Sequence, residues 1–157
     1  LVKGELKEVA KKIAQHTFTL EEFLWAELQA GHINTDLFSD ESQTVYFHGH
    51  CHQKSLSSMD ATMGILSMAP NKTVVPIECG CCGMAGSFGY EKDHYDISMA
   101  IGELSLFPAV RKAPLTALIS ASGTSCRQQI MDGTGRKAYH PADILYQWLK
   151  EKPESGP

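Results

Sequence analysis

Residues 45–52 read Val-Tyr-Phe-His-Gly-His-Cys-His, and this stretch decides the fold class of the chain. A short β-prone run comes first, a loop with histidine, glycine and cysteine follows, and an apolar helical pattern then covers residues 53–68. The same order recurs downstream. Strands are predicted at 73–77, 115–121 and 137–139, and helices at 91–106, 126–131 and 141–150. This alternation predicts an α/β fold with a mainly parallel sheet of about four strands flanked by helices.

The chain upstream of these strands has a helical pattern. Residues 4–15 place apolar side chains at helical spacing, and Thr19 with Glu22 forms a capping box that starts a helix over residues 20–30. The strand–helix rhythm begins only after these helices.

The domain organisation follows from this change of pattern. We expect an N-terminal helical segment over residues 1–43 and a cysteine-rich α/β domain over residues 44–157, packed as one compact unit. The start Leu-Val-Lys-Gly favours a piece of a longer protein.

The composition and charge of the chain argue against nucleic-acid and membrane-spanning functions. Hydrophobic residues make up 43% and charged residues 20% of the chain, which is typical of a globular domain. The net charge of -4 and the absence of a basic run argue against nucleic-acid binding. No apolar stretch approaches the ~20 residues of a membrane helix. We expect a cytoplasmic location, with any contact to the inner membrane made through partners.

The cysteines are concentrated in loops that follow predicted strands. Cys79, Cys81 and Cys82 lie within four residues, whereas Cys51 and Cys126 stand apart. In open α/β sheets the loops after the strands converge at the carboxyl edge, where ligands bind. The topology therefore predicts that distant cysteines meet at one place.

The cysteine pattern favours metal or thiol chemistry over disulfides, because the number of cysteines is odd and no secretion signal is present. Thiolates hold iron–sulfur clusters, typically four per cluster. Residues 79–89 carry glycine at every third position, and Gly83 directly after the cysteine pair allows the backbone to approach an inorganic core. Zinc is the main rival, although the C-x-C and C-C spacings fit structural zinc sites poorly.

The histidines near these loops allow two interpretations. His48, His50 and His52 alternate around Cys51, and each could ligate a metal or donate to a cluster sulfur. A hydrogen-bonded loop histidine is the favoured interpretation for any single one. His140, before a proline, is expected to position a helix start.

Four segments together resemble the cysteine-rich CCG domain of iron–sulfur oxidoreductases. They are HCH at 50–52, CCGMAGSFGY at 81–90, TSCRQQI at 124–130 and HP at 140–141. This domain occurs in heterodisulfide reductase and in the iron–sulfur subunits of anaerobic glycerol-3-phosphate dehydrogenase and glycolate oxidase. The four segments are most similar to the C-terminal part of fused FAD-linked oxidase–iron–sulfur proteins.

The resemblance implies an electron-transfer domain of an FAD-dependent dehydrogenase for a 2-hydroxy acid such as D-lactate, glycolate or D-2-hydroxyglutarate. It implies a 4Fe-4S-type cluster held by Cys51, Cys81, Cys82 and Cys126. FAD is expected in the parent protein or a partner, and not in this chain. The implied partners are a flavin dehydrogenase domain or subunit, other iron–sulfur modules, and a quinone or other acceptor. The isolated chain is expected to relay electrons without oxidising the acid itself.

The chain departs from the family pattern at one position. Many members carry C-x-x-C where this chain has Gly123-Thr124-Ser125-Cys126, so one expected cysteine is glycine. Cys79 is an additional cysteine, and it is either a packed thiol or a supporting ligand. A zinc-binding docking module and a thiol-based, disulfide-cleaving domain are the alternative functions.

Overall fold

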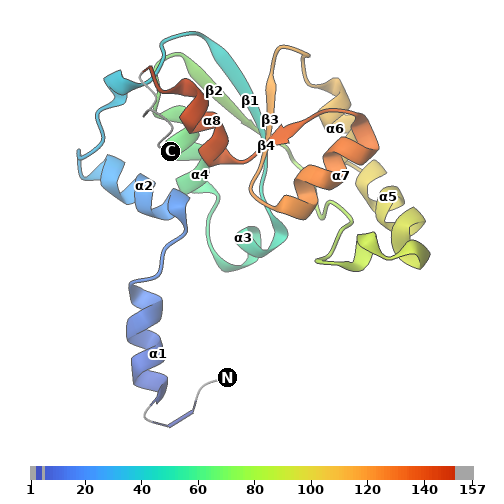
Figure 1. The fold of residues 1–157 in the computed structure, drawn as a ribbon, viewed down its shortest axis with the longest axis horizontal. Helices are drawn as coiled ribbons and strands as arrows, with labels where there is room; N and C mark the ends of the chain where they lie inside the picture. Colours follow the sequence, from blue (N-terminus) through green and yellow to red (C-terminus); the bar gives the residue numbers. More distant parts are fainter. Residues whose placement is uncertain (1–2, 5, 151–157) are drawn as a thin grey trace, which may run out of the picture.

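Four strands form one sheet in the part of the chain that the structure describes, residues 3–4 and 6–150 (Figure 1). In this computed structural model the strand order is β2-β1-β3-β4, and every pairing is parallel. The bounds are Gln43–His48 for β1, Lys72–Pro76 for β2, Leu118–Ala121 for β3 and Ala138–Tyr139 for β4. The predicted α/β fold is confirmed.

Helices cover both faces of the sheet. In Figure 1, α4 and α8 lie on one side with α2 beyond them, and α5, α6 and α7 lie on the other side. The helices are α1 Leu6–Gln15, α2 Leu20–Gln29, α3 Cys51–Leu56, α4 Asp60–Ser67, α5 Tyr95–Glu103, α6 Leu106–Lys112, α7 Thr124–Thr134 and α8 Pro141–Trp148. Short 3-10 turns occupy Thr35–Leu37 (η1), Phe88–Tyr90 (η2) and Lys92–His94 (η3).

Within the described ranges, no helix combines the length and the hydrophobicity needed to cross a bilayer.

The strand side chains alternate between two apolar cores. Val45 and Phe47 are buried against α4 and α8, whereas Ile119 and Ala121 are buried against α6 and α7. This alternation is the period-2 geometry of a strand, and burial of both faces is typical of a parallel sheet. The cores hold the sheet between two helical layers, which leaves the loops at the strand ends free for a site.

The N-terminal helices differ in how they contact this body. The capping box of α2 is present, because the Thr19 hydroxyl accepts from the Glu22 amide at 3.2 Å and the Glu22 carboxylate accepts from the Thr19 amide at 2.8 Å. Trp25 of α2 packs so closely on Gly64 of α4 that a Cβ at Gly64 would lie 2.2 Å from the ring. By contrast, α1 buries none of its residues and extends away from the rest (Figure 1). The boundary at residue 43 stays a prediction.

The prediction of one continuous helix at 53–68 is wrong, because the structure has two helices there, α3 and α4. Helix α3 begins at Cys51, and Ser57 then adopts extended backbone angles, φ −147° and ψ −179°. The Ser58 hydroxyl accepts from the Asp60 amide at 2.9 Å. Serine hydroxyls compete with the helix ladder in this way, and the competition explains the break.

The helix predicted at about 91–106 is confirmed over Tyr95–Glu103, but its bounds and its predicted buried face are wrong. The structure has η3, α5 and then α6, a helix that the sequence pattern did not reveal. The buried positions of α5 are Ser98 and Gly102, whereas Ile97 is 54% exposed. Small residues face inward here because the ring of Phe107, from α6, fills the space beside Gly102.

The contact between Gly102 and Phe107 gives a test of this packing. The Phe107 ring is fully buried between Gly102 and Gly133, and a Cβ at either glycine would lie 2.3 Å from it. We expect Gly102→Ala to lower the free energy of unfolding by about 1–3 kcal/mol, because overpacking outweighs the helix-propensity gain of at most ~1 kcal/mol. Urea denaturation measures the change. Gly80→Ala is the control, since its Cβ would meet no atom within 4 Å. Equal stability of the two variants would contradict the packing described here.

Candidate metal centre

All the cysteines lie in the connections that follow β1, β2 and β3. Cys51 is the first residue of α3, Cys79, Cys81 and Cys82 lie in the loop after β2, and Cys126 is in the first turn of α7. The three strands are parallel neighbours, so these connections leave the sheet at the same edge. The parallel sheet thus brings the cysteine-bearing segments together.

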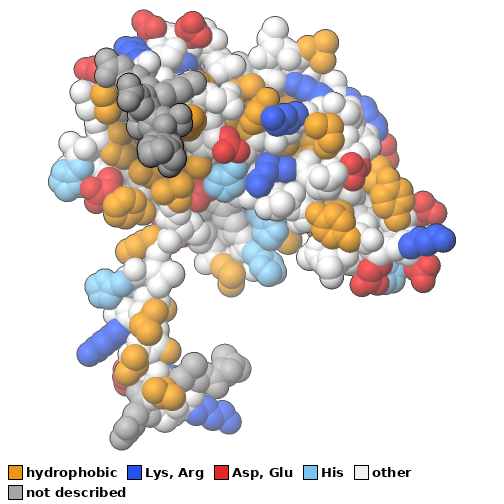
Figure 2. Space-filling model, viewed as in Figure 1, with side chains coloured by type: hydrophobic (Ala, Val, Ile, Leu, Met, Phe, Trp, Pro, Cys, Tyr) orange, Lys and Arg blue, Asp and Glu red, His pale blue; other side chains and the backbone are white. Residues whose placement is uncertain are grey.

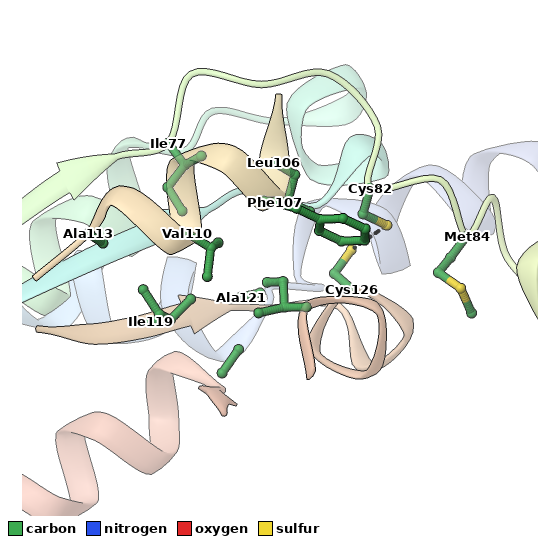
Figure 3. Close-up of a cluster of buried hydrophobic side chains, with 12 residues drawn as sticks. Ile77, Cys82, Met84, Leu106, Phe107, Val110, Ala113, Ile119, Ala121 and Cys126 are labelled. Atoms are coloured by element: carbon green, nitrogen blue, oxygen red, sulfur yellow. Dashed lines mark hydrogen bonds between the residues drawn. The ribbon is translucent and has the colours of Figure 1, made fainter. Parts of the chain in front are cut away.

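Cys82 and Cys126 form the buried part of the site. Their side chains point toward one another in Figure 3, and their Sγ atoms lie 3.3 Å apart. Both residues are almost inaccessible to solvent, and Phe107 and Ala121 belong to the same apolar cluster. Two thiols separated by 44 positions in the chain therefore share one small volume.

Cys51 and Cys81 face the open part of the site. With Cys82 they line a cavity of about 390 Å³ that also touches Ser125 and Ala85. Cys51 is exposed and Cys81 is half-buried, so the cavity opens toward the surface. Three of the four cysteines predicted as ligands thus line one cavity, and Cys126 lies beside Cys82 outside its lining; their binding of a metal stays a prediction.

The electrostatics of the buried pair show how closely these groups interact. The pKa of Cys82 is lowered, mainly by the hydrogen bond with Cys126 and also by His48. The pKa of Cys126 is raised by the same hydrogen bond, by burial and by the negative charges of Cys82, Cys51 and Cys81. The pair therefore favours a thiolate at Cys82 and a protonated thiol at Cys126. Ionisation of both thiols requires a cation nearby to balance the second negative charge.

His48 is a site residue that sequence reasoning did not single out from its neighbours. It is the last residue of β1 and is buried, and its Nδ1 lies 3.0 Å from the Cys79 Sγ. One ligand atom from each of His48, Cys82 and Cys126 lies within 4.8 Å of the other two. The alternation of side chains along β1 could have identified His48, because it directs His48 to the face opposite the one that buries Phe47.

The pKa of His48 is raised overall. Burial is the largest single influence and lowers it, but hydrogen bonds to Cys79 and Cys82 and the negative charge of those thiolates together outweigh burial. A protonated His48 would place a positive charge beside the thiols. Positive potential of this kind stabilises thiolates.

Gly83 gives the cysteine loop its turn. Its φ is +101°, which L side chains rarely adopt, and a Cβ there would lie 2.2 Å from the Ser98 carbonyl oxygen. The Gln129 amide, buried in α7, donates to this carbonyl at 3.0 Å and to the Ser98 hydroxyl at 2.9 Å. Gly83 therefore packs against a buried pair formed by Ser98 and Gln129. Nothing in the sequence indicated that these two polar residues would be buried beside the cysteine loop.

Cys79 lies behind the cavity. Its thiol contacts His48, and its carbonyl oxygen accepts from the Lys54 ammonium at 2.8 Å. The cavity itself is lined by Cys51, Cys81 and Cys82 among the cysteines. Neither Cys79 nor Cys126 lines the cavity, but the Cys126 thiol contacts Cys82 whereas the Cys79 thiol contacts His48, and this difference favours a supporting role for Cys79.

His50 and His140 each cap a helix. The His50 Nδ1 accepts from the His52 amide at 3.2 Å at the start of α3. The His140 Nδ1 accepts from the Ala142 amide at 3.2 Å, and Asp143 completes a capping box at the start of α8. The prediction that His140 positions a helix start is confirmed.

The chain is similar to segments of known dehydrogenases. D-2-hydroxyglutarate dehydrogenase of Escherichia coli (strain K12) is 32% identical over 109 residues, which are 69% of this chain and 11% of that protein. One subunit of the anaerobic glycerol-3-phosphate dehydrogenase of the same strain is 27% identical over 139 residues, which are 88% of this chain and 34% of that polypeptide. D-2-hydroxyglutarate dehydrogenase of Pantoea ananatis is 38% identical over 73 residues, 46% of this chain and 7% of that protein.

The chain thus spans only 11% and 34% of the first two relatives. No protein-family model matches it. No solved structure matches it either. These similarities support an oxidoreductase-related role, in agreement with a redox or metal site built from cysteine and histidine.

The proximity of Cys82 and Cys126 predicts their behaviour on oxidation. We expect mild oxidation of the metal-free chain with diamide to join them in a disulfide before any other pair, because their Sγ atoms already lie 3.3 Å apart. Non-reducing peptide mapping by mass spectrometry identifies the product. In Cys82→Ser, disulfides should form more slowly and between other pairs of cysteines. A dominant bond between Cys51 and Cys79 would contradict the geometry.

Proposed function

We propose that this chain is an iron–sulfur electron-transfer domain of an FAD-dependent dehydrogenase for a 2-hydroxy acid. The observation that carries the proposal is that Cys51, Cys81 and Cys82 line one cavity at the carboxyl edge of the sheet, while the Cys126 Sγ lies 3.3 Å from the Cys82 Sγ. Four thiolates are the ligand set typical of such clusters.

The residues present fit a cluster in chemistry as well as in number. A bound 4Fe-4S-type cluster would supply reversible one-electron transfer. Cys81 and Cys51 would hold its open side, and Cys82 with Cys126 its buried side. The Gly83 amide already donates to the Cys81 Sγ at 3.3 Å, and amide hydrogen bonds to sulfur are one means of tuning a reduction potential.

The apolar wall behind the site favours electron transfer over solvent chemistry. Cys82 and Cys126 belong to the same buried cluster as Phe107 and Met84, so water has little access from the core side. Low solvent access influences the reduction potential of a cluster and slows the loss of the cluster itself. The cavity mouth near Cys51 is then the side through which electrons exchange with partners.

The partners follow from the relatives' names and from the family resemblance. Relatives named D-2-hydroxyglutarate dehydrogenase support a dehydrogenase domain or subunit, joined to or bound by this chain. The family resemblance adds that this partner carries a flavin and oxidises D-2-hydroxyglutarate, D-lactate or glycolate. Electrons then pass from FAD, through this and other iron–sulfur modules, to a quinone or other acceptor in the cytoplasm or at the inner membrane. The isolated chain is a relay and reduces no dye with a hydroxy acid alone.

A zinc-binding module is the second candidate. One observation favours it: His48, Cys82 and Cys126 are all buried and place ligand atoms within 4.8 Å of one another. Neutral imidazole and thiolates are ordinary zinc ligands. In this arrangement, however, Cys51 and Cys81 on the cavity wall would have no role.

Metal analysis of anaerobically produced protein distinguishes the two candidates. We expect iron and acid-labile sulfide in equal amounts, with visible charge-transfer absorbance that bleaches on reduction. Zinc alone would support the second candidate. A protein with neither metal and only titratable thiols would favour the thiol-based, disulfide-cleaving alternative.

Ligand variants test the assignment of each cysteine. After anaerobic reconstitution, we expect Cys81→Ala and Cys82→Ala to lose most of the bound iron, because each removes a thiolate from the cavity wall. Cys79→Ala should retain more than half, since this thiol supports His48 behind the cavity. Iron per chain and visible absorbance give the comparison. Full loss in Cys79→Ala with retention in Cys81→Ala would reverse the assignment.

A further inference from the structure

A second cavity lies beside the cysteine cavity. Its volume is about 530 Å³, and its walls come from the first turn of α2, from α3 with its cap, from the loop after β3 and from His140. His50 and His52 line both cavities. Figure 2 shows histidine side chains near the middle of this face of the molecule. None of the functions assigned above uses this second cavity.

The lining of the second cavity is polar and negatively charged. All of its lining residues except Leu56 and Gly123 have polar side chains. Glu21 and Glu22 are acidic, and no lysine or arginine is among the described residues that line it. Carboxylates attract cations and repel anions, and this effect is stronger in a cavity than in open water. The walls therefore favour a positively charged occupant.

The Glu21 carboxylate is buried without a positive charge beside it. The residue is only 7% exposed, and its carboxylate accepts no hydrogen bond from any residue that the structure describes. Its one ion-pair contact among these residues is with the His140 Nε2 at 3.6 Å, which is longer than an ordinary hydrogen bond. A buried carboxylate is costly unless a cation pairs with it. Glu21 therefore provides a reason for a cation to enter.

Hydrogen bonding keeps the neighbouring imidazoles neutral. The Nδ1 atoms of His50 and His140 accept backbone N–H groups, at 3.2 Å each. An imidazole that accepts at Nδ1 has no proton there, so it is neutral and carries its proton on Nε2. His140 therefore brings no positive charge to Glu21. Both rings instead offer an N–H donor at Nε2.

The cavity thus combines a carboxylate for a cation with N–H donors for neutral oxygens. A lysine or arginine side chain within a polypeptide matches both features, because its charged end pairs with a carboxylate and the backbone carbonyls beside it accept hydrogen bonds. The chain has a net charge of -4, so copies of it repel one another. A different, basic polypeptide is the better match.

We propose that this cavity receives a lysine or arginine side chain of a second, different polypeptide, with the Glu21 carboxylate as the group that pairs with its charge. The His50 and His140 Nε2–H groups hold backbone carbonyl oxygens of the same segment. Because His50 also lines the cysteine cavity, the docked segment lies beside the cysteine site. Docking requires no metal, so the proposal does not rest on the electron-transfer function.

Peptide titration of the full, metal-free chain tests the proposal. The probe is the peptide acetyl-Ala-Lys-Ala-amide, and NMR shifts of the backbone amides give its Kd. We expect Glu21→Gln to raise the Kd at least about 10-fold, because a charge-assisted contact is lost. Glu27→Gln, an exposed residue of the same helix paired with His32, is the matched control and should change the Kd less than twofold. Circular dichroism should be unchanged in both variants.

Two further probes use the unaltered protein. A peptide with norleucine in place of lysine lacks the ammonium group, and n-butylamine lacks the backbone carbonyls. Each should bind at least about 10-fold more weakly than the lysine peptide. Equal binding of the norleucine peptide, or an unchanged Kd in Glu21→Gln, would overturn the inference. Equal binding of n-butylamine would overturn the assignment to a polypeptide.

Failure of the electron-transfer function is recognised separately. A chain that binds the lysine peptide through Glu21 but holds no iron after anaerobic production keeps this docking site and loses only the cluster. A chain that holds iron but does not bind the peptide keeps the cluster and loses only the docking site.

Discussion

The parallel pairing of β1 with β2 on one side and β3 on the other is the constraint on which the site depends. Parallel strands send their following loops to the same edge of the sheet. Residues 51, 81, 82 and 126, which are far apart in sequence, reach one place only because these strands are neighbours with this register. An antiparallel arrangement of the same elements would put Cys126 on the opposite edge.

The pairing also explains why a charged group can be buried at this edge. His48 ends β1 on the face opposite Phe47, so the strand that fills one core also delivers an imidazole to the thiols. Alone, a buried imidazole would lose its proton, and a buried thiolate would gain one. Together with Cys79 and Cys82, each favours the charged form of the other, and a polar centre persists inside an apolar cluster.

The sequence predicted the parts of this molecule that depend on local pattern and topology. The parallel sheet, the capping box at Thr19 and the helix start at His140 follow from short-range signals, and the meeting of cysteine-bearing loops follows from the strand order. Helix α6 and the inward face of α5 were missed because tertiary packing decides them. Gly102 faces the core only because Phe107 needs the space, and Ser98 is buried only because Gln129 satisfies its polar atoms. No periodicity in the sequence carries that information.

The departure from the family pattern at Gly123 has a physical consequence. Any side chain at this position would place its Cβ 2.4 Å from the His50 ring, closer than real Cβ atoms approach other atoms. A cysteine at 123, as many members of the resembled family have, would therefore require the His50 ring to move. The absence of a side chain at Gly123 and the position of the His50 ring are therefore linked by this steric contact. The space that a Cβ at position 123 would take is filled by the His50 ring, which lines the cysteine cavity and accepts the His52 amide at its Nδ1.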